Sequence, residues 1–232
     1  NENEYTITMP AYDVGVIVWL KEAEAKTFTA TLHIVDTTSA LRNKVTMQIQ
    51  GDPGRNTTID GGKITDLVGG EILETIIQPQ DNSVKIAGVM VSEGGASPVF
   101  ITASALNTYL HTMNAVDTDI WVFLGDYHIA TAVKDDPAGL PGNQILNIAN
   151  LTNPALPNSS PLWTLAETAD EIQVQAVTEP GYFAAVTADI VKADGSRVAI
   201  APDRIYQDVN TSTITIRLLD KMPDDNVEVT VH

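Results

Sequence analysis

Apolar and polar residues alternate with a period of two along much of the chain, as in β-strands with one buried face. The clearest examples are residues 28–35, 172–176 and 214–218. Turn residues, among them several glycine pairs, separate further β-prone runs at 45–49, 72–77, 84–91, 99–102 and 120–124. The sequence therefore predicts a mainly β protein, built from antiparallel β-sandwich-like modules in series.

One segment departs from this alternation. Between residues 102 and 113, apolar side chains recur at helical spacing, at Leu106, Tyr109, Leu110 and Met113. Thr102 or Ser104 could cap the start of such a helix. The spacing predicts an amphipathic helix over about 102–113, packed on a sheet.

A short pattern occurs twice. Residues 9–18 and 222–231 both begin with Met-Pro, continue through a three-residue turn that ends on Asp or Asn, and finish with Val-x-Val-x-Val. An internal repeat favours modules in series over one closed enzyme domain. In the first copy the alternating side chains are Val14, Val16, Val18 and Leu20. A lone hairpin is unstable in water, so this strand must pack on other chain segments or on a partner.

These patterns suggest three parts. Residues 1–26 form a terminal hairpin and a charged linker. Residues 27–165 form a β-rich domain with the helix, and this domain ends in a loop rich in Pro and Asn from about residue 134. Residues 166–232 form a small β module, whose Ala193-Asp194-Gly195-Ser196 segment is typical of a hairpin turn.

Residues 170–232 resemble the internalin-type B-repeat modules, or bacterial repeat domains, of large bacterial surface proteins. The matching features are an alternating strand before Glu179-Pro180-Gly181-Tyr182, the Asp194-Gly195 hairpin, and a Thr-Ile-Thr-Ile stretch leading to Met222-Pro223. Residues 5–18 are similar to the closing hairpin of the same module. The resemblance implies an extracellular, cell-surface location and a stalk, spacer or receptor-contact role without catalytic residues. The motifs of residues 27–165 identify no family, so any specific function is expected to lie there.

Composition limits the choice of partners. The 30 acidic and 13 basic residues give a net charge of −17, which disfavours nucleic acid and anionic membranes. No apolar run is long enough to span a membrane, so no membrane insertion is expected. The first four residues lack the basic and apolar regions of a signal peptide, so if the protein is exported, its leader is expected outside this sequence or already removed.

The sequence carries no recognisable catalytic motif. It has no cysteine, no Gly-x-Ser-x-Gly element and no His-Glu-x-x-His element. The four histidines, at 33, 111, 128 and 232, are too far apart in the chain to form a metal-binding pair on one helix. We therefore expect a protein that is not an enzyme and holds no cofactor.

Calcium is the one cofactor that the acidic residues suggest, because it prefers clustered carboxylate oxygens in loops. The candidate ligands are Asp117, Asp119, Asp135 and Asp136, which would have to be brought together by the fold. Solubility is the alternative explanation for this acidity.

Two other chemistries are conceivable. Lysine–asparagine isopeptide cross-links, known in surface adhesins, could involve Lys44, Lys85, Asn147 or Asn226, although no spacing singles out a pair. A glycan platform could be formed by the aromatic residues Trp121, Tyr127 and Trp163. The alternative for Trp121 is burial in a core, because it lies within an apolar run.

Three functions remain open. The leading hypothesis is a non-catalytic segment of a surface protein, acting as stalk or adhesin, with other modules of the same protein as partners. The alternative is a self-assembling fibre subunit that donates strand 14–20 to an identical subunit by β-augmentation. A glycan-binding module, or a module that contacts a host ligand, is the third.

Overall fold

The computed structural model describes residues 26–36, 44–78, 85–135, 144–160, 162–179, 184–210 and 213–232. Within these ranges the chain forms strands β1 to β20 and a short 3-10 turn at Pro202–Arg204. The prediction of a mainly β, sandwich-like protein is confirmed. In the described part of the chain no helix is long and apolar enough to cross a membrane.

The first half of the chain forms sandwich 1 from two five-stranded sheets. Sheet A has the strand order β4-β1-β10-β6-β7, and sheet B the order β3-β2-β5-β9-β8. The strands are β1 (Phe28–Asp36), β2 (Val45–Ile49), β3 (Asp52–Thr57), β4 (Lys63–Leu67), β5 (Ile72–Ile77), β6 (Ile86–Glu93), β7 (Val99–Phe100), β8 (Ala103–Ala105), β9 (Thr108–Thr112) and β10 (Thr118–Leu124).

The second half forms sandwich 2. Sheet C has the order β13-β14-β11-β20-β16-β17, and sheet D the order β12-β15-β19-β18. The strands are β11 (His128–Lys134), β12 (Gln144–Asn150), β13 (Asn158–Ser159), β14 (Trp163–Ala166), β15 (Ile172–Val177), β16 (Val186–Val191), β17 (Arg197–Ala199), β18 (Ile205–Asn210), β19 (Thr213–Leu218) and β20 (Asn226–Val231).

Each sandwich is closed by its first and last strands. β1 pairs in parallel with β10, and β11 pairs in parallel with β20, whereas the other strand pairs are antiparallel. Alternation decides which face is buried: every second residue of β1 is buried in the core between sheets A and B. In sandwich 2, Val227, Val229 and Val231 of β20 point into the core between sheets C and D.

The division between the sandwiches differs from the boundary expected near residue 165. β11 and β14 share sheet C with β20, and β12 pairs with β15, so residues 128–166 belong to the same sandwich as 172–231. The two sandwiches are joined instead by residues 125–127. Within the described part of the Pro- and Asn-rich stretch, residues 144–150 form β12 and residues 158–159 form β13. The proposed terminal hairpin, residues 1–25, lies outside the described residues.

The predicted helix over 102–113 is wrong. This segment is a hairpin of β8 and β9, and Asn107 turns the chain at a φ of 53°. Leu106 lies in that turn and is 67% exposed, so its helical spacing to Leu110 has no structural meaning. β9 pairs with β5 over five residue positions, and this non-local ladder outweighs the local pattern.

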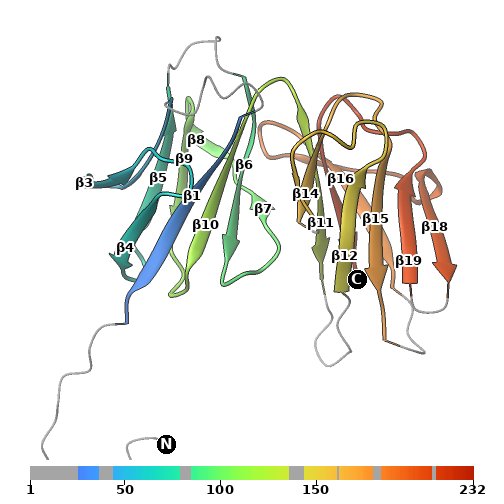
Figure 1. Ribbon diagram of the computed structural model, residues 1–232, viewed down its shortest axis with the longest axis horizontal. Helices are drawn as coiled ribbons and strands as arrows, with labels where there is room; N and C mark the ends of the chain where they lie inside the picture. The colour runs from blue at the N-terminus through green and yellow to red at the C-terminus, as the bar shows by residue number, and fades with distance from the viewer. Residues whose placement is uncertain are drawn as a thin grey trace, which may run out of the picture.

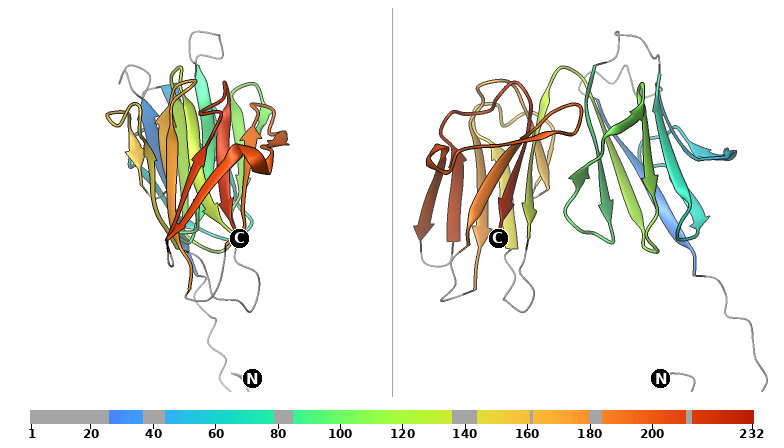
Figure 2. Two further views of the ribbon diagram at one scale, coloured as in Figure 1. Left: turned by 90° about the vertical axis from the view of Figure 1, so that its right-hand side faces the viewer. Right: turned by 180° about the vertical axis from the view of Figure 1, so that it is seen from behind.

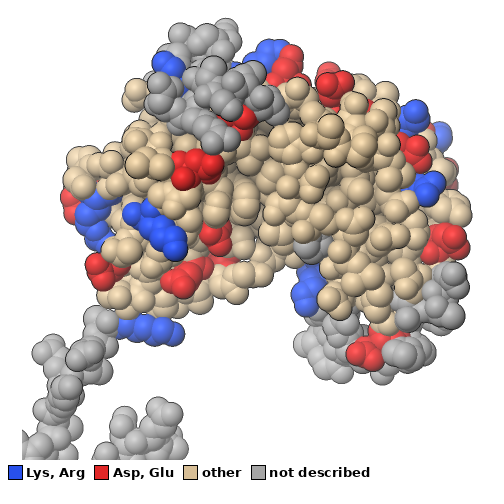
Figure 3. Space-filling model, in the orientation of Figure 1, with Lys and Arg blue, Asp and Glu red and all other residues tan. Residues whose placement is uncertain are grey.

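The two sandwiches lie side by side, and the connection from β10 to β11 crosses at one end of the molecule (Figure 1). The beginning of β1 and the C-terminus lie at the opposite end (Figure 1). The view from behind shows the loop between β16 and β17 extending from sandwich 2 toward sandwich 1 (Figure 2). The surface is continuous near the connection, and a notch separates the sandwiches below it (Figure 3).

Glu93 connects the two sheets of sandwich 1. At the end of β6, its carboxylate lies 2.9 Å from His111 Nε2 of β9 and accepts hydrogen bonds from the backbone N–H and side-chain amide of Asn114. Burial alone would raise the pKa of Glu93, but these hydrogen bonds and the nearby imidazole together hold the pKa below its ordinary value. The ionised form of Glu93 therefore stabilises the folded state.

We expect the substitution Glu93→Gln to lower the melting temperature at pH 5.5 and to matter less in acid. A carboxylate with a depressed folded-state pKa contributes stability above its unfolded pKa, and this contribution disappears as pH falls through the folded-state pKa. Thermal melts from pH 5.5 to 3 should show the two curves converging. Glu179→Gln, at an exposed position, is the control. A difference that stays constant with pH would contradict this role.

Candidate functional site

Among the described residues, a third buried apolar cluster lies where the two sandwiches meet, and we call this contact the junction. Five side chains are buried there: Met90, Phe123, Ile129, Trp163 and Leu165. They come from β6 and β10 of sandwich 1 and from β11 and β14 of sandwich 2. The neighbours Val122 and Ala130 point into the two sandwich cores instead. The outward faces of sheets A and C therefore share a third core.

Aromatic rings fill this third core. Trp163 of sandwich 2 meets Phe123 of sandwich 1 edge to face, with ring centroids 4.8 Å apart. Its ring also meets Trp121 at 5.7 Å, and His33 is stacked on Trp121 at 4.0 Å. Edge-to-face aromatic pairs contribute about 0.5–1.5 kcal/mol beyond the area that they bury. The rings therefore add apolar and edge-to-face contacts between the sandwiches.

Asn226 connects the two sandwiches through hydrogen bonds. Its Oδ1 accepts from the backbone N–H of Ile129 at 2.7 Å, and its Nδ2 donates to the carbonyl of Ala87 at 2.8 Å. The side chain of Asn226 is buried. Asn226 is the first residue of β20, the strand that follows the Met222-Pro223 turn. Because Ala87 lies on sandwich 1, one amide satisfies backbone groups on both sides of the junction.

Two glycines allow the backbones to approach. A side chain at Gly88 of β6 would come within 2.9 Å of Ile129 and 3.3 Å of Phe100. At Gly195, in the β16–β17 turn, a Cβ would stand 2.1 Å from the Thr102 hydroxyl of sandwich 1. Gly195 also has a φ of 81°, which L-residues rarely adopt. The sandwiches thus touch at the β16–β17 turn as well as at the third core.

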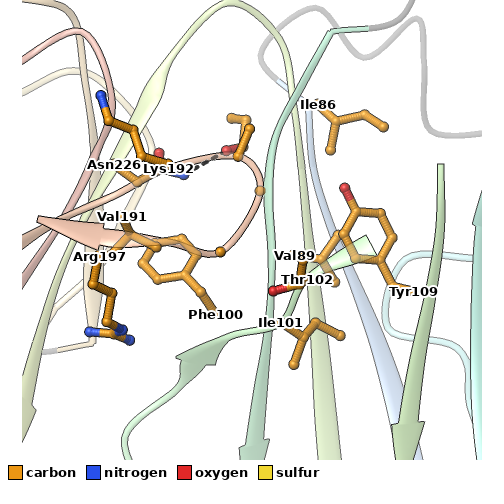
Figure 4. Close-up of a pocket in the computed structure, with 14 residues that line it drawn as sticks. Ile86, Val89, Phe100, Ile101, Thr102, Tyr109, Val191, Lys192, Arg197 and Asn226 are labelled. Carbon is orange, nitrogen blue, oxygen red and sulfur yellow. Dashed lines mark hydrogen bonds between the residues drawn. The ribbon is translucent and has the colours of Figure 1, made fainter. Parts of the chain in front are cut away.

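A small cavity of about 80 Å³ remains between the sandwiches. Figure 4 shows Val89, Ile101 and Tyr109 on one side of it, with Val191 and Asn226 on the other. Burial raises the pKa of the Tyr109 hydroxyl, so this residue stays neutral. The cavity has room for a few water molecules rather than for a sizeable ligand.

Charges at the edge of the junction are paired. Glu228 of β20 stands opposite Asp189 of β16, and two carboxylates in such a position repel each other. Arg197 donates to both oxygens of Glu228, at 2.6 and 3.2 Å, and lies 3.6 Å from Asp189. Hydrogen bonding to Glu228 raises the pKa of Arg197 above its ordinary value. This bidentate arrangement offsets the repulsion.

The candidate calcium ligands are placed in different surroundings. Asp117 accepts a hydrogen bond from the backbone N–H of Thr29 at 2.9 Å, and Asp119 pairs with His33 at 2.8 Å. Asp135 belongs to sandwich 2 and pairs with His232 at 3.2 Å. Asp136 lies outside the described residues. Among the described residues no group of three or more His, Cys, Asp or Glu side chains could hold a metal ion.

The other sequence-based candidates are placed as follows. Trp163 is only 3% exposed and packs with Trp121 and Tyr127 in the third core, so these residues form no open platform. Lys85 pairs with Asp126, and the Asn226 amide is used by the backbone groups of Ile129 and Ala87. The Asn147 side-chain oxygen accepts from Ser160. The proposed donor residues, Val14, Val16, Val18 and Leu20, lie outside the described residues.

Sequence reasoning missed the junction as a site, although the sequence contains a signal for it. Residues 120–124 form an uninterrupted apolar run, Ile-Trp-Val-Phe-Leu, in place of the alternation seen in β1. Such a run is typical of a strand that is covered on both faces. Asn226 carried no comparable signal, because the pattern of the Met-Pro turn does not reveal its partner Ala87.

No protein-family model matches the chain, and no curated protein matches it either. Among solved structures, the chain is similar to the major pilin from Streptococcus pyogenes, with 12% sequence identity, 90% of this chain and 98% of that chain covered, and a TM-score of 0.23. A mutant of the same pilin gives 9% identity, 88% and 96% coverage, and a TM-score of 0.22. At these TM-scores the likeness carries no argument about function. The resemblance to B-repeat modules stays a prediction.

We expect Asn226→Ala to destabilise the protein by about 2–4 kcal/mol, because it leaves two buried backbone groups without partners. Urea denaturation measures this loss. Asn226→Asp keeps the acceptor for Ile129 but cannot donate to Ala87, so it tests the link to sandwich 1 separately. Asn158→Ala, at an exposed position, is the matched control. If Asn226→Ala behaves like the control, the amide does not hold the junction.

The contact of the β16–β17 turn can be tested with two glycines of similar backbone conformation. Gly61 has a φ of 75° and open space around its Cβ position, so Gly61→Ala should cost about 1 kcal/mol from the backbone alone. Gly195→Ala should cost clearly more in the same denaturation measurement, because the methyl group meets Thr102. Adding Thr102→Ala should restore part of the difference. Equal costs at the two glycines would show that the turn does not press on sandwich 1.

Proposed function

We propose that this chain is a non-catalytic structural module of a bacterial extracellular or cell-surface protein, in which it serves as a stalk or adhesive unit. The observation that carries the proposal is the junction, which unites two sandwiches into one body. The connection is only three residues long, residues 125–127. Domains of one chain move relative to each other unless their interface is large and apolar. The buried third core supplies such an interface.

A fixed shape suits a protein whose task is to hold or present a surface. At the junction, buried aromatic and polar groups serve the contact between the sandwiches: Trp163 packs against the rings of sandwich 1, and Asn226 bonds to backbone groups on both sides. The net charge of −17 keeps such a module soluble and apart from other acidic surfaces. Its partners in this proposal are other modules of the same protein.

The course of the chain favours an adhesive unit over an in-line spacer. The beginning of β1 and the end of β20 lie at the same end of the molecule (Figure 1). A spacer in a linear stalk would place these two points at opposite ends. In this arrangement the end with residues 125–127 projects away from the points where the described chain begins and stops, which is the geometry of a presented head.

Surface exposure can be tested on intact cells of the organism that produces the chain. We expect brief protease treatment of the cells to remove the protein, detected with an antibody raised against residues 26–232, while a cytoplasmic control protein is retained. Immunogold labelling of untreated cells should decorate the outer surface. Protection from the protease in intact cells, followed by digestion after lysis, would contradict the proposal.

A self-assembling fibre subunit is the second candidate, and β20 is the observation that favours it. The Val-x-Val-x-Val pattern of β20 places Val227, Val229 and Val231 in the core, with strands paired on both sides. Residues 14–18 carry the same pattern. The segment therefore has the composition of a strand that completes a sheet, and an identical subunit could receive it.

A further inference from the structure

Sheet D ends in an unpaired strand edge. β18 pairs with β19 over residues 205–210 without a register shift, and the described residues place no strand on its other side. Alternate backbone N–H and C=O groups along that side point outward without a ladder partner. Natural edge strands are usually short, bulged or rich in lysine and proline, which discourages pairing with another chain. β18 is six residues long, and its only charged residue is Asp208.

Apolar side chains are exposed around this edge. Tyr206 and Val209 of β18 are 44% and 48% exposed, and Leu219, just after β19, is 55% exposed. At the beginning of β18 a hollow is lined by Ile190, Ile200 and Leu218, together with the charged residues Arg204, Asp220 and Lys221. Exposed apolar groups beside an open strand edge favour the addition of a strand that covers them.

The chain contains a segment with the composition that this edge requires. Residues 14–20 read Val-Gly-Val-Ile-Val-Trp-Leu and carry no charge. Two copies of a chain with a net charge of −17 repel each other, so an uncharged strand is the part that one copy can bring closest to another. The spacing of Val14, Val16 and Val18 matches that of the core valines of β20.

A second copy is the source that the arrangement favours. β18 is at the side of sandwich 2 that faces away from sandwich 1, whereas the chain enters sandwich 1 at β1 (Figure 1). Residues 14–20 precede β1, so within one molecule they would have to pass around sandwich 2. A neighbouring molecule meets no such obstacle.

We propose that the free edge of β18 accepts residues 14–20 of a second copy as an added strand of sheet D. This inference rests on the fibre-subunit function and names the surface that such a subunit would use. Backbone hydrogen bonds along β18 would supply the affinity, and the apolar side chains of the added strand would cover Tyr206 and Val209. Because the donor segment and the β18 edge are different parts of the molecule, the contact is head-to-tail.

The absence of native cysteine allows a direct test in the full-length chain. A tagged chain carrying Val16→Cys is mixed with an untagged chain carrying Gln207→Cys, on the exposed part of β18, under mild oxidation. Mass spectrometry then quantifies the tagged–untagged disulfide dimer. In the control mixture the second chain carries Ala103→Cys, on β8 at the exposed edge of sheet B. We expect about tenfold more mixed dimer with Gln207→Cys than with the control, from the higher local concentration at the docked edge.

The outcomes separate the acceptor from the function. Equal yields of mixed dimer with both acceptor variants, or a larger yield with Ala103→Cys, would overturn β18 as the acceptor. If light scattering still showed oligomers of the unmodified chain, the fibre-subunit function would stand. Monomers at high concentration together with no mixed dimer would overturn both. Excess of the Gln207→Cys homodimer would show β18 pairing with itself, and an intramolecular disulfide in a Val16→Cys, Gln207→Cys double variant would show donation within one copy. Either result would contradict the proposal.

Discussion

The burial of the outward faces of β10 and β11 is the constraint on which the rest of the structure depends. These strands are consecutive, separated by three residues, and each already has one face in a sandwich core. Phe123 and Ile129 on their other faces can leave water only if the sandwiches meet. Full burial of a large apolar side chain contributes about 1.5–3 kcal/mol. The burial of five such side chains therefore favours the docked arrangement over two sandwiches that move independently, although separation would increase their conformational entropy.

Apolar contact alone would not fix how the sandwiches are oriented. Asn226 adds direction, because its two hydrogen bonds form only when Ile129 and Ala87 occupy set positions on either side. Gly88 allows the two backbones to approach closely, because the side chain of any larger residue at this position would collide with Ile129 and Phe100. At the edge of the same contact, Arg197 forms ion pairs with both Glu228 and Asp189 and so offsets the repulsion between these two carboxylates. The junction is therefore specified by polar and steric detail as well as by area.

The local pattern predicted the strands well and their pairing poorly. Alternation at residues 28–35 and 172–176 corresponds to β1 and β15, because burial of one face is a local property of the sequence. The supposed helix and the supposed boundary near residue 165 both failed for one reason. Whether residues 108–112 pair with β5, or β12 with β15, depends on segments far away in the chain. The partner of Asn226 lies 139 residues away, beyond any local pattern.

The direction of the chain has a mechanical consequence. It runs up sandwich 1, crosses at residues 125–127 and runs down sandwich 2, so the start of β1 and the end of β20 share the end where the notch opens (Figures 1 and 3). Tension applied between these two points acts as a lever on the junction and peels it from the notch inward. Compression at the same points presses the two walls together. The one body formed by the two sandwiches would therefore resist compression better than tension, and the aromatic contacts of the third core would oppose its opening.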